Sequence, residues 1–286
     1  MHPKNIHQNK YDIDKLCQVF PALRAFVFVN KYGTQTINFS SDKAVKALNT
    51  ALLKFHYAID YWQFPDNNLC PPIPGRADYL HHLNELLNLP KQARILDIGT
   101  GATVIYPLLG LRLFDWQFVA SEINPDSYHN AIEIVAKNEL TNQIEVRLQQ
   151  NHKHILNGIV QKNEKFTASI CNPPFFQSKK AALQANARKV RGLNKKKVQK
   201  TVVNQNFSGI SDELWTVGGE KAFVTKYIDE SLLYKNQFEW FTSLISNKDN
   251  LKALQYLLQK QKAKTKIIEM SQGNKTIHIL AWRYTN

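Results

Sequence analysis

A Gly-rich turn that follows an apolar strand limits most strongly how this chain can fold. Residues 95–98 read Ile-Leu-Asp-Ile, a run typical of a buried strand, and residues 99–101 read Gly-Thr-Gly. A helical segment, 104–113, comes next, although we expect Pro107 to interrupt it. This strand–turn–helix predicts the first unit of a nucleotide-binding α/β sheet. Val104 stands where the dinucleotide fingerprint has its third glycine, so the turn favours a ligand without a pyrophosphate.

Two later strands of the predicted sheet also lead into polar residues. Strand 117–121 ends in Glu122, about twenty residues after the glycines, the spacing of a carboxylate that binds ribose hydroxyls. Strand 166–171 leads into Asn172. A helix over 126–138 and a strand over 144–148 fill the interval, which gives a βαβαβ order. Because carboxyl ends of parallel strands share one edge, we expect Asp97, Glu122 and Asn172 to lie together.

The tetrapeptide Asn172-Pro173-Pro174-Phe175 gives this edge a possible chemistry. Two prolines stiffen the backbone and cannot continue a sheet ladder. The Asn172 side chain and the Pro173 carbonyl offer two hydrogen-bond acceptors, which suit a planar amine with two hydrogens. Phe175 can stack on a flat ring. On these four residues alone, a Pro-rich turn with a core phenylalanine is an equal alternative.

The positive charge of the chain indicates a polyanionic partner. The 286 residues carry a formal charge of +14, which favours nucleic acid first and an anionic membrane surface second. No apolar run is long enough to span a bilayer, and the first residues lack the core of a secretory signal, so we expect a cytoplasmic protein. Three cysteines without a CxxC pair indicate neither a disulfide framework nor a zinc site. The pairs His81–His82 and His152/His154 lack metal partners at suitable spacing, so we expect surface histidines and no metal.

Residues 1–75 are predicted to form a separate N-terminal unit. Lys4 and Lys10 lie in a basic first stretch, for which a flexible tail and a nucleic-acid contact are the alternatives. Ser41-Asp42 predicts the start of a helix. Its expected core face is formed by Val45, Leu48, Leu52 and Phe55.

A Pro-rich connector, 64–75, ends that unit and is expected to stop any helix. It delivers Arg76 to the start of the next predicted helix. An arginine there could clamp a carboxylate through two hydrogen bonds, or it could be an ordinary surface residue.

A basic segment follows the Asn-Pro-Pro-Phe motif. Residues 177–211 contain no Asp or Glu and few large apolar side chains, so we expect a mobile insertion beside the site. Its charge favours contact with an RNA backbone over a merely solvated loop. The basic residues of this segment are Lys179, Lys180, Arg188, Lys189, Arg191, Lys195, Lys196, Lys197 and Lys200.

Taken together, these motifs resemble those of class I S-adenosylmethionine-dependent methyltransferases. Four stretches are similar, more closely, to the adenine-N6 RNA methyltransferases that modify large-subunit ribosomal RNA, whose eukaryotic relatives act on small nuclear and messenger RNA hairpins. They are 74–76 (PGR), 96–110 (LDIGTGATVIYPLLG), 172–176 (NPPFF) and 213–223 (ELWTVGGEKAF). The first glycine motif and NPPF define only the broad class, whereas the extended glycine stretch and the GGE segment are more specific.

The resemblance implies an α/β fold, with a class I Rossmann-like seven-stranded sheet in residues 76–286 and a small, mainly helical RNA-binding unit in 1–75. S-adenosylmethionine is the implied cofactor, and the implied partner is large-subunit ribosomal RNA or its precursor particle, bound by a monomer. Arg76 would bind the methionine carboxylate and Glu122 the ribose. Asp97, at the end of its strand, can accept hydrogen bonds from an ammonium group. The implied site also contains Gly99, Gly101 and Thr103 near the methionine moiety, Asn172 and Pro173 at the target amine, and Phe175 stacked on the base. Pro174 belongs to the same catalytic motif.

Two other functions fit parts of the pattern. Asn-Pro-Pro-Phe/Tyr also serves guanine-N2 RNA methyltransferases and glutamine methyltransferases of release factors. The basic insertion disfavours a protein substrate, and the GGE segment favours adenine. A non-enzymatic RNA-binding protein on the same scaffold is the third possibility, against which the intact Asp97, Glu122 and Asn172 argue.

Overall fold

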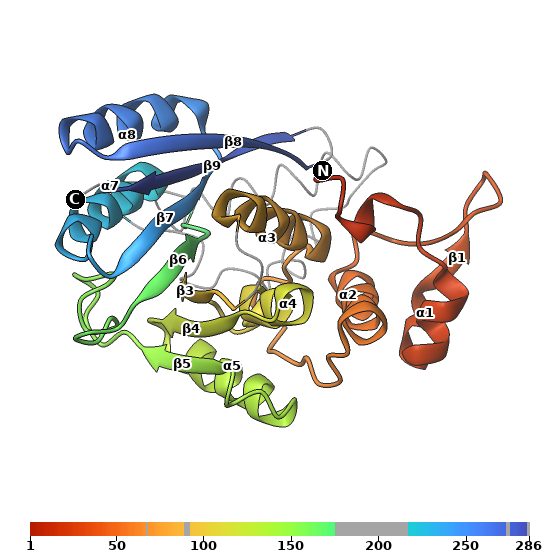
Figure 1. Ribbon diagram of the computed structural model, residues 1–286. Coiled ribbons are helices and arrows are strands. Elements are labelled where there is room, and N and C mark those ends of the chain that lie inside the picture. The colour runs from red at the N-terminus through yellow and green to blue at the C-terminus, as the bar shows by residue number, and fades with distance from the viewer. Residues whose placement is uncertain (67, 89–91, 175–216, 273–274, 285–286) are drawn as a thin grey trace.

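A single mixed sheet forms the centre of the molecule (Figure 1). The computed structural model describes residues 1–66, 68–88, 92–174, 217–272 and 275–284. The main sheet has seven strands: β3 (Arg94–Ile98), β4 (Gln117–Glu122), β5 (Ile144–Leu148), β6 (Phe166–Cys171), β7 (Phe238–Ile245), β8 (Lys264–Gln272) and β9 (Lys275–Arg283). Their order is β5-β4-β3-β6-β7-β9-β8; the first five are parallel, and β9 is antiparallel to both of its neighbours. The predicted α/β class and strand pattern are confirmed.

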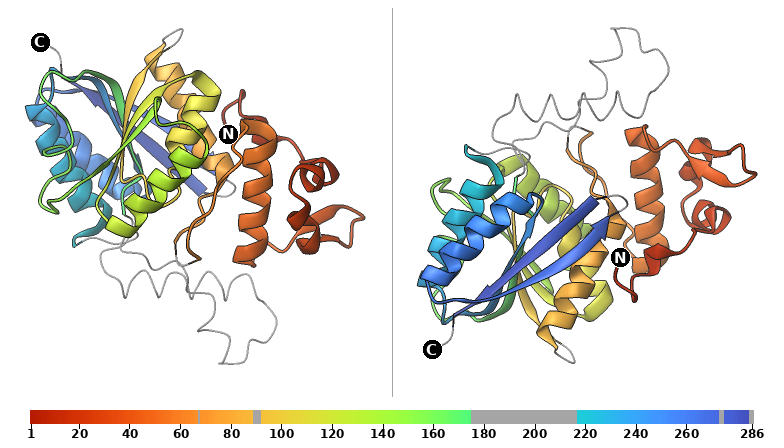
Figure 2. Two further views of the ribbon diagram at one scale, coloured as in Figure 1. Left: turned by 90° about the horizontal axis from the view of Figure 1, so that it is seen from below. Right: turned by 90° about the horizontal axis from the view of Figure 1, so that it is seen from above.

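Helices cover both faces of this sheet (Figure 2). One face carries α3 (Ile73–Leu87), α4 (Ile105–Phe114) and α5 (Pro125–Lys137), and the other carries α7 (Gly219–Leu233) and α8 (Lys248–Lys260). The two cores follow from side-chain alternation along each strand, since Ile95 belongs to the first core and Leu96 to the second. None of the helices in these described ranges is long and apolar enough to cross a bilayer.

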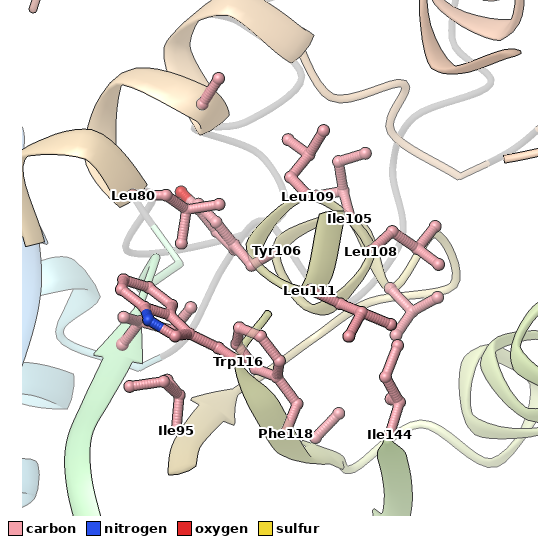
Figure 3. Close-up of a cluster of buried hydrophobic side chains, with 14 of the residues drawn as sticks. Leu80, Ile95, Ile105, Tyr106, Leu108, Leu109, Leu111, Trp116, Phe118 and Ile144 are labelled. Carbon is pink, nitrogen blue, oxygen red and sulfur yellow. The ribbon is translucent and has the colours of Figure 1, made fainter. Parts of the chain in front are cut away.

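Helix α4 packs closely on the sheet through the last glycine of the extended glycine stretch. Trp116, just before β4, and Phe118 of β4 lie beneath it (Figure 3). A Cβ atom at Gly110 would meet Phe118 Cζ at 2.4 Å, well inside van der Waals contact. Phe118 is buried and cannot move away cheaply, so any larger residue at this position would overpack the core.

The N-terminal unit has its own small core. It contains η1 (Ile6–Gln8), α1 (Ile13–Val19), η2 (Pro21–Phe26), a hairpin of β1 (Val27–Val29) and β2 (Gln35–Ile37), and α2 (Asp42–Tyr57). The Ser41 hydroxyl accepts the Ala44 N–H at 3.3 Å, which confirms the predicted helix cap. Phe55 is 43% exposed, however, so its assignment to the core face was wrong. The first residues are not a free tail either, because His2, Asn5 and His7 are buried.

Two predicted helix boundaries were also wrong, for one physical reason. Helix α4 runs through Pro107 without a break, and α3 begins inside the Pro-rich connector, so that it includes Pro74 and Arg76. In both helices the proline occupies the first turn, where the backbone N–H has no intrahelical partner to lose.

Candidate active site

Strand register brings the predicted polar residues to one edge of the sheet. Ile98 of β3 pairs with Ser121 of β4 and with Cys171 of β6. The residues that follow these three positions are Gly99, Glu122 and Asn172. The expected meeting of three strand ends is therefore confirmed, whereas the chemical role of each residue remains a prediction.

The glycine turn is held from the β4 side. Gly99 and Gly101 have φ values of +71° and +66°, which favour glycine. The Gly101 N–H donates to Glu122 Oε2 at 2.8 Å, and the N–H groups of Ile123 and Asn124 donate to Oε1. Glu122 thus shapes the turn; its binding of ribose hydroxyls stays a prediction. No atom lies within 4 Å of a Cβ built at Gly99, so the turn is open there.

Asp97 is the most perturbed acid of this edge. Its side chain is 1% exposed, and neither carboxylate oxygen has a hydrogen-bond partner among the described residues. Burial raises the pKa of Asp97 to about 7, and the Glu122 carboxylate adds to the rise. The Thr100 hydroxyl, which lies close to the carboxylate without a well-formed hydrogen bond, and the Arg76 guanidinium partly offset this rise in pKa. A buried carboxyl in this state would gain strongly from a cationic ligand.

Arg76 is a buried residue of this site and not an ordinary surface arginine. It lies in the first turn of α3 with 7% of its surface exposed, and its guanidinium is 5.4 Å from the centroid of the Tyr106 ring. Burial raises the pKa of Tyr106 to about 12. Tyr106 was not singled out from the sequence, because only the fold shows that α4 faces Arg76.

Asn172 follows a strand, β6, that is fixed by buried hydrogen bonds. The Thr242 hydroxyl donates to the Ser169 carbonyl at 2.6 Å and is bonded to the Tyr79 hydroxyl at 2.7 Å. Ser169 also bonds to Tyr227, so β6 is fixed from both faces of the sheet. The Asn172 Oδ1 atom is buried without a described partner. The strand that leads into Asn172 is therefore fixed, and the Asn172 side chain has an acceptor available for a ligand.

Several unpaired polar groups lie at this edge of the sheet, and those close to Arg76 and Asp97 fit a zwitterionic ligand. Buried side-chain atoms without a described partner include both Asp97 oxygens, Thr100 Oγ1, Tyr106 Oη and Asn172 Oδ1. Each such group costs about 1–3 kcal/mol if it stays unpaired, so several together indicate a ligand that completes them. A carboxylate on Arg76 and an ammonium group on Asp97 would suit an amino-acid moiety.

The turn is also bonded to the segment that joins the N-terminal unit to the sheet. The Trp62 indole donates to the Thr103 carbonyl at 3.0 Å. The Asn130 amide donates to the Ala102 carbonyl at 2.7 Å and to the Gln63 carbonyl at 3.0 Å. Thr103 itself is buried, as a residue near a ligand moiety would be. These long-range contacts had no signal in the sequence.

Glu220 of the GGE segment is structural in the described contacts. Its buried carboxylate accepts the Ser246 N–H and hydroxyl at 2.7 and 2.5 Å and the Asn250 amide at 2.9 Å. The Asn247 N–H is 3.3 Å away. This single side chain therefore joins the first turn of α7 to the loop between β7 and α8. Strand β7 pairs with β6, so the loop lies near the end of β6.

Replacing Glu220 with alanine is expected to destabilise the protein by about 3 kcal/mol, because several buried donors lose their acceptor at once. Urea denaturation measures this change. Glu239→Ala, at an exposed position of β7, is the matched control and should stay within about 0.5 kcal/mol of the parent protein. Equal stability of the two variants would contradict the bridging role of Glu220.

Several predicted site residues lie outside the described residues. These are Phe175 and the basic residues of the insertion, Lys179, Lys180, Arg188, Lys189, Arg191, Lys195, Lys196 and Lys197. Lys4 and Lys10 are described, and both are exposed on the N-terminal unit, as a contact with nucleic acid requires.

The matching family model and two similar relatives all describe RNA methyltransferases. The chain matches the family Methyltransf_10, described as RNA methyltransferase, over residues 1–286. It is 46% identical to the Ribosomal RNA large subunit methyltransferase F of Christiangramia forsetii, with 99% of this chain and 100% of the relative covered. It is 45% identical to the protein of the same name from Klebsiella pneumoniae, with 99% of this chain and 94% of that relative covered.

Solved structures of human METTL16 share the fold. The catalytic domain in complex with the MAT2A 3'UTR hairpin 6 has a TM-score of 0.84 at 30% identity, covering 100% of this chain and 98% of that chain. The N-terminal domain in complex with SAH has a TM-score of 0.80 at 27% identity, with coverage of 100% and 99%.

Proposed function

The chain belongs to the RNA methyltransferase family that it matches over its whole length, and we propose that it methylates N6 of an adenine in large-subunit ribosomal RNA, with S-adenosylmethionine as the donor. One observation carries the proposal. Buried, unpaired polar groups of Asp97 and Asn172 meet where β3 and β6 end, beside the open glycine turn. A zwitterionic donor and a planar amine together would complete these groups.

The methionine end of the donor is assigned to the buried pair of charges. Arg76 would bind the carboxylate, and Asp97 would accept hydrogen bonds from the ammonium group. Thr100 and Tyr106 add two hydroxyls that have no described partner. The Gly99–Gly101 turn and Thr103 would lie against the same moiety, and Glu122 would hold the ribose, in addition to its backbone bonds.

Arg76→Lys is expected to weaken S-adenosylmethionine binding about tenfold or more, because lysine keeps the charge but loses the planar fork. Isothermal titration calorimetry gives the dissociation constant. Arg112→Lys, an exposed change on α4, should leave it unaltered. Unchanged affinity in Arg76→Lys would remove the guanidinium from the cofactor site.

The acceptor half of the reaction depends on Asn172 and Pro173. S-adenosylmethionine supplies an electrophilic methyl group on a sulfonium. An adenine amine is a poor nucleophile, since its lone pair is delocalised into the ring. The Asn172 amide oxygen and the Pro173 carbonyl would accept its two N–H groups, favour a pyramidal nitrogen and aim the lone pair at the methyl group. As the new N–C bond forms, the sulfur–methyl bond would break and release the neutral thioether S-adenosylhomocysteine, while the amine would lose a proton to solvent, so no strong base is needed.

Positive charge supports RNA as the substrate. The chain carries a net charge of +14, and Lys4 and Lys10 are exposed on the N-terminal unit. We assign the unit of residues 1–75 and the basic insertion at about 177–211 to contacts with the phosphate backbone, which give affinity with little sequence choice. The target base must leave its stack to reach Asn172.

Nucleoside mass spectrometry of ribosomal RNA tests the proposal. A strain that lacks this gene should lose N6-methyladenosine from its large-subunit RNA, and a plasmid copy should restore it. Loss of N2-methylguanosine with N6-methyladenosine unchanged would instead support the guanine-N2 reading of the Asn-Pro-Pro-Phe motif.

A further inference from the structure

A second group of polar residues lies away from the candidate active site, on the face of α3 that meets the start of the chain. Asp78, His81, His82 and Glu85 are spaced at i, i+3, i+4 and i+7, so that they share one side of the helix. The chain's first residues place His2 against this side. The His2 ring stacks on His81 with centroids 5.3 Å apart and meets His82 edge-on at 4.9 Å.

We propose that His2, His82 and Glu85 bind a divalent transition-metal ion, best fitted by Zn²⁺, that fastens the first residues to α3. One ligand atom from each residue lies within 4.8 Å of the other two. A tetrahedral zinc ion with bonds of about 2.0–2.2 Å needs ligand atoms about 3.4 Å apart. His2 Nε2 and Glu85 Oε2 are already 3.4 Å apart, so small side-chain rotations complete the set.

The donor types select the metal. Two imidazoles and one carboxylate suit zinc and similar first-row ions, whereas magnesium and calcium prefer oxygen ligands alone. Asp78 is fully buried and its Oδ2 atom, 3.8 Å from His82 Nε2, has no described hydrogen-bond partner. If His82 binds the ion through Nδ1, its Nε2–H faces this carboxylate, the outer arrangement that is common around zinc.

Part of the site is open to solvent. Two of the three ligands, His2 and Glu85, line a surface cavity together with Lys4 and His81, and the buried Nε2 atom of His81 has no partner among the described residues. The Glu85 side chain is 73% exposed, so the ion would keep contact with water and exchange readily. Two carboxylates beside two neutral imidazoles balance the charge of a divalent cation.

One existing contact must change on binding. The His2 Nδ1 atom accepts the Lys4 N–H at 3.2 Å, which places the ring proton of a neutral His2 on Nε2. Ligation through Nε2 moves that proton to Nδ1, and the Lys4 contact then opens. The anchoring bonds of the segment remain, since the His2 N–H donates to Asp78 Oδ1 at 2.6 Å and the Asn5 amide donates to the Pro74 carbonyl at 3.0 Å.

The sequence spacing could not show this site, because His2 is separated by about eighty residues from the helix that supplies the other ligands. The expectation that His81 is a surface residue was wrong, since it is 7% exposed. The inference does not depend on the proposed methyl transfer.

Calorimetric titration of the full, tag-free chain with zinc chloride tests the site. We expect one ion per chain, a higher melting temperature with zinc, and slower hydrogen exchange of the first eight residues. His82→Ala and Glu85→Gln should each weaken zinc affinity about tenfold or more. Loss of a residue that only hydrogen-bonds to a metal ligand already lowers metal affinity about tenfold, and loss of a ligand itself should lower it at least as much. Glu85 is exposed, so its variant tests the site without threatening the fold.

His129→Ala, an exposed histidine on α5, is the matched control and should bind zinc as the parent protein does. No uptake of zinc by the parent protein would overturn the proposal. Equal affinity in the parent protein, His82→Ala and Glu85→Gln would do the same, because zinc would then bind elsewhere.

Discussion

Asn172→Ala is expected to lower turnover by about 100- to 1000-fold, the usual cost of removing one preorganised hydrogen-bonding group from a reacting centre. The amide oxygen is buried without a described partner, on a strand fixed by Thr242 and Tyr227. Removing it takes away one of two acceptors that would orient the amine. The cofactor groups Arg76 and Asp97 are untouched, so affinity for S-adenosylmethionine should stay within about twofold of the parent value.

Single-turnover methylation of an RNA substrate, with cofactor binding measured separately, distinguishes these effects. Asn236→Ala, an exposed asparagine in the loop before β7, is the control and should keep full activity. An Asn172→Ala protein that kept turnover within about threefold of the parent would show that the amide does not hold the amine.

Strand positions were predictable because each depends on a local apolar run. The limits of β5 and β6 agree with the sequence prediction, and the meeting of Asp97, Glu122 and Asn172 then follows from parallel pairing alone. Glycine and proline patterns were less reliable at helix starts, where a proline in the first turn costs nothing.

Residues brought in by tertiary contacts were beyond the reach of the sequence. Trp62 bonds to Thr103 across 41 positions, and Tyr106 meets Arg76 only because α3 and α4 lie side by side. Neither pairing has a periodic or spaced pattern. The burial of His2 is the clearest example of a contact that the sequence does not predict. The basic composition of the first ten residues is typical of a solvated tail, yet His2 is buried.

Asp97→Asn is expected to stabilise the cofactor-free protein above neutral pH while it weakens cofactor binding. Burial raises the pKa of Asp97 in the folded protein to about 7, against 3.8 for an ordinary aspartate. Between these values the folded state binds the proton and the unfolded state does not, so stability falls as pH rises from about 4 to about 7. The penalty is fully present above pH 7 and amounts to at most roughly 4 kcal/mol.

Asparagine keeps the shape of the side chain and removes this charge. Urea denaturation at pH 4.5 and pH 8 should therefore show a gain for Asp97→Asn only at the higher pH, and none for Asp60→Asn, whose side chain is 89% exposed. In the same variant, S-adenosylmethionine affinity should fall about tenfold or more, since an amide replaces the carboxylate partner of an ammonium group. Parent affinity should also rise with pH up to about 7, because the cation selects the ionised form. A variant that loses stability at pH 8 would contradict the cost of the buried charge, and a variant that binds the cofactor as the parent does would exclude Asp97 from the ammonium site.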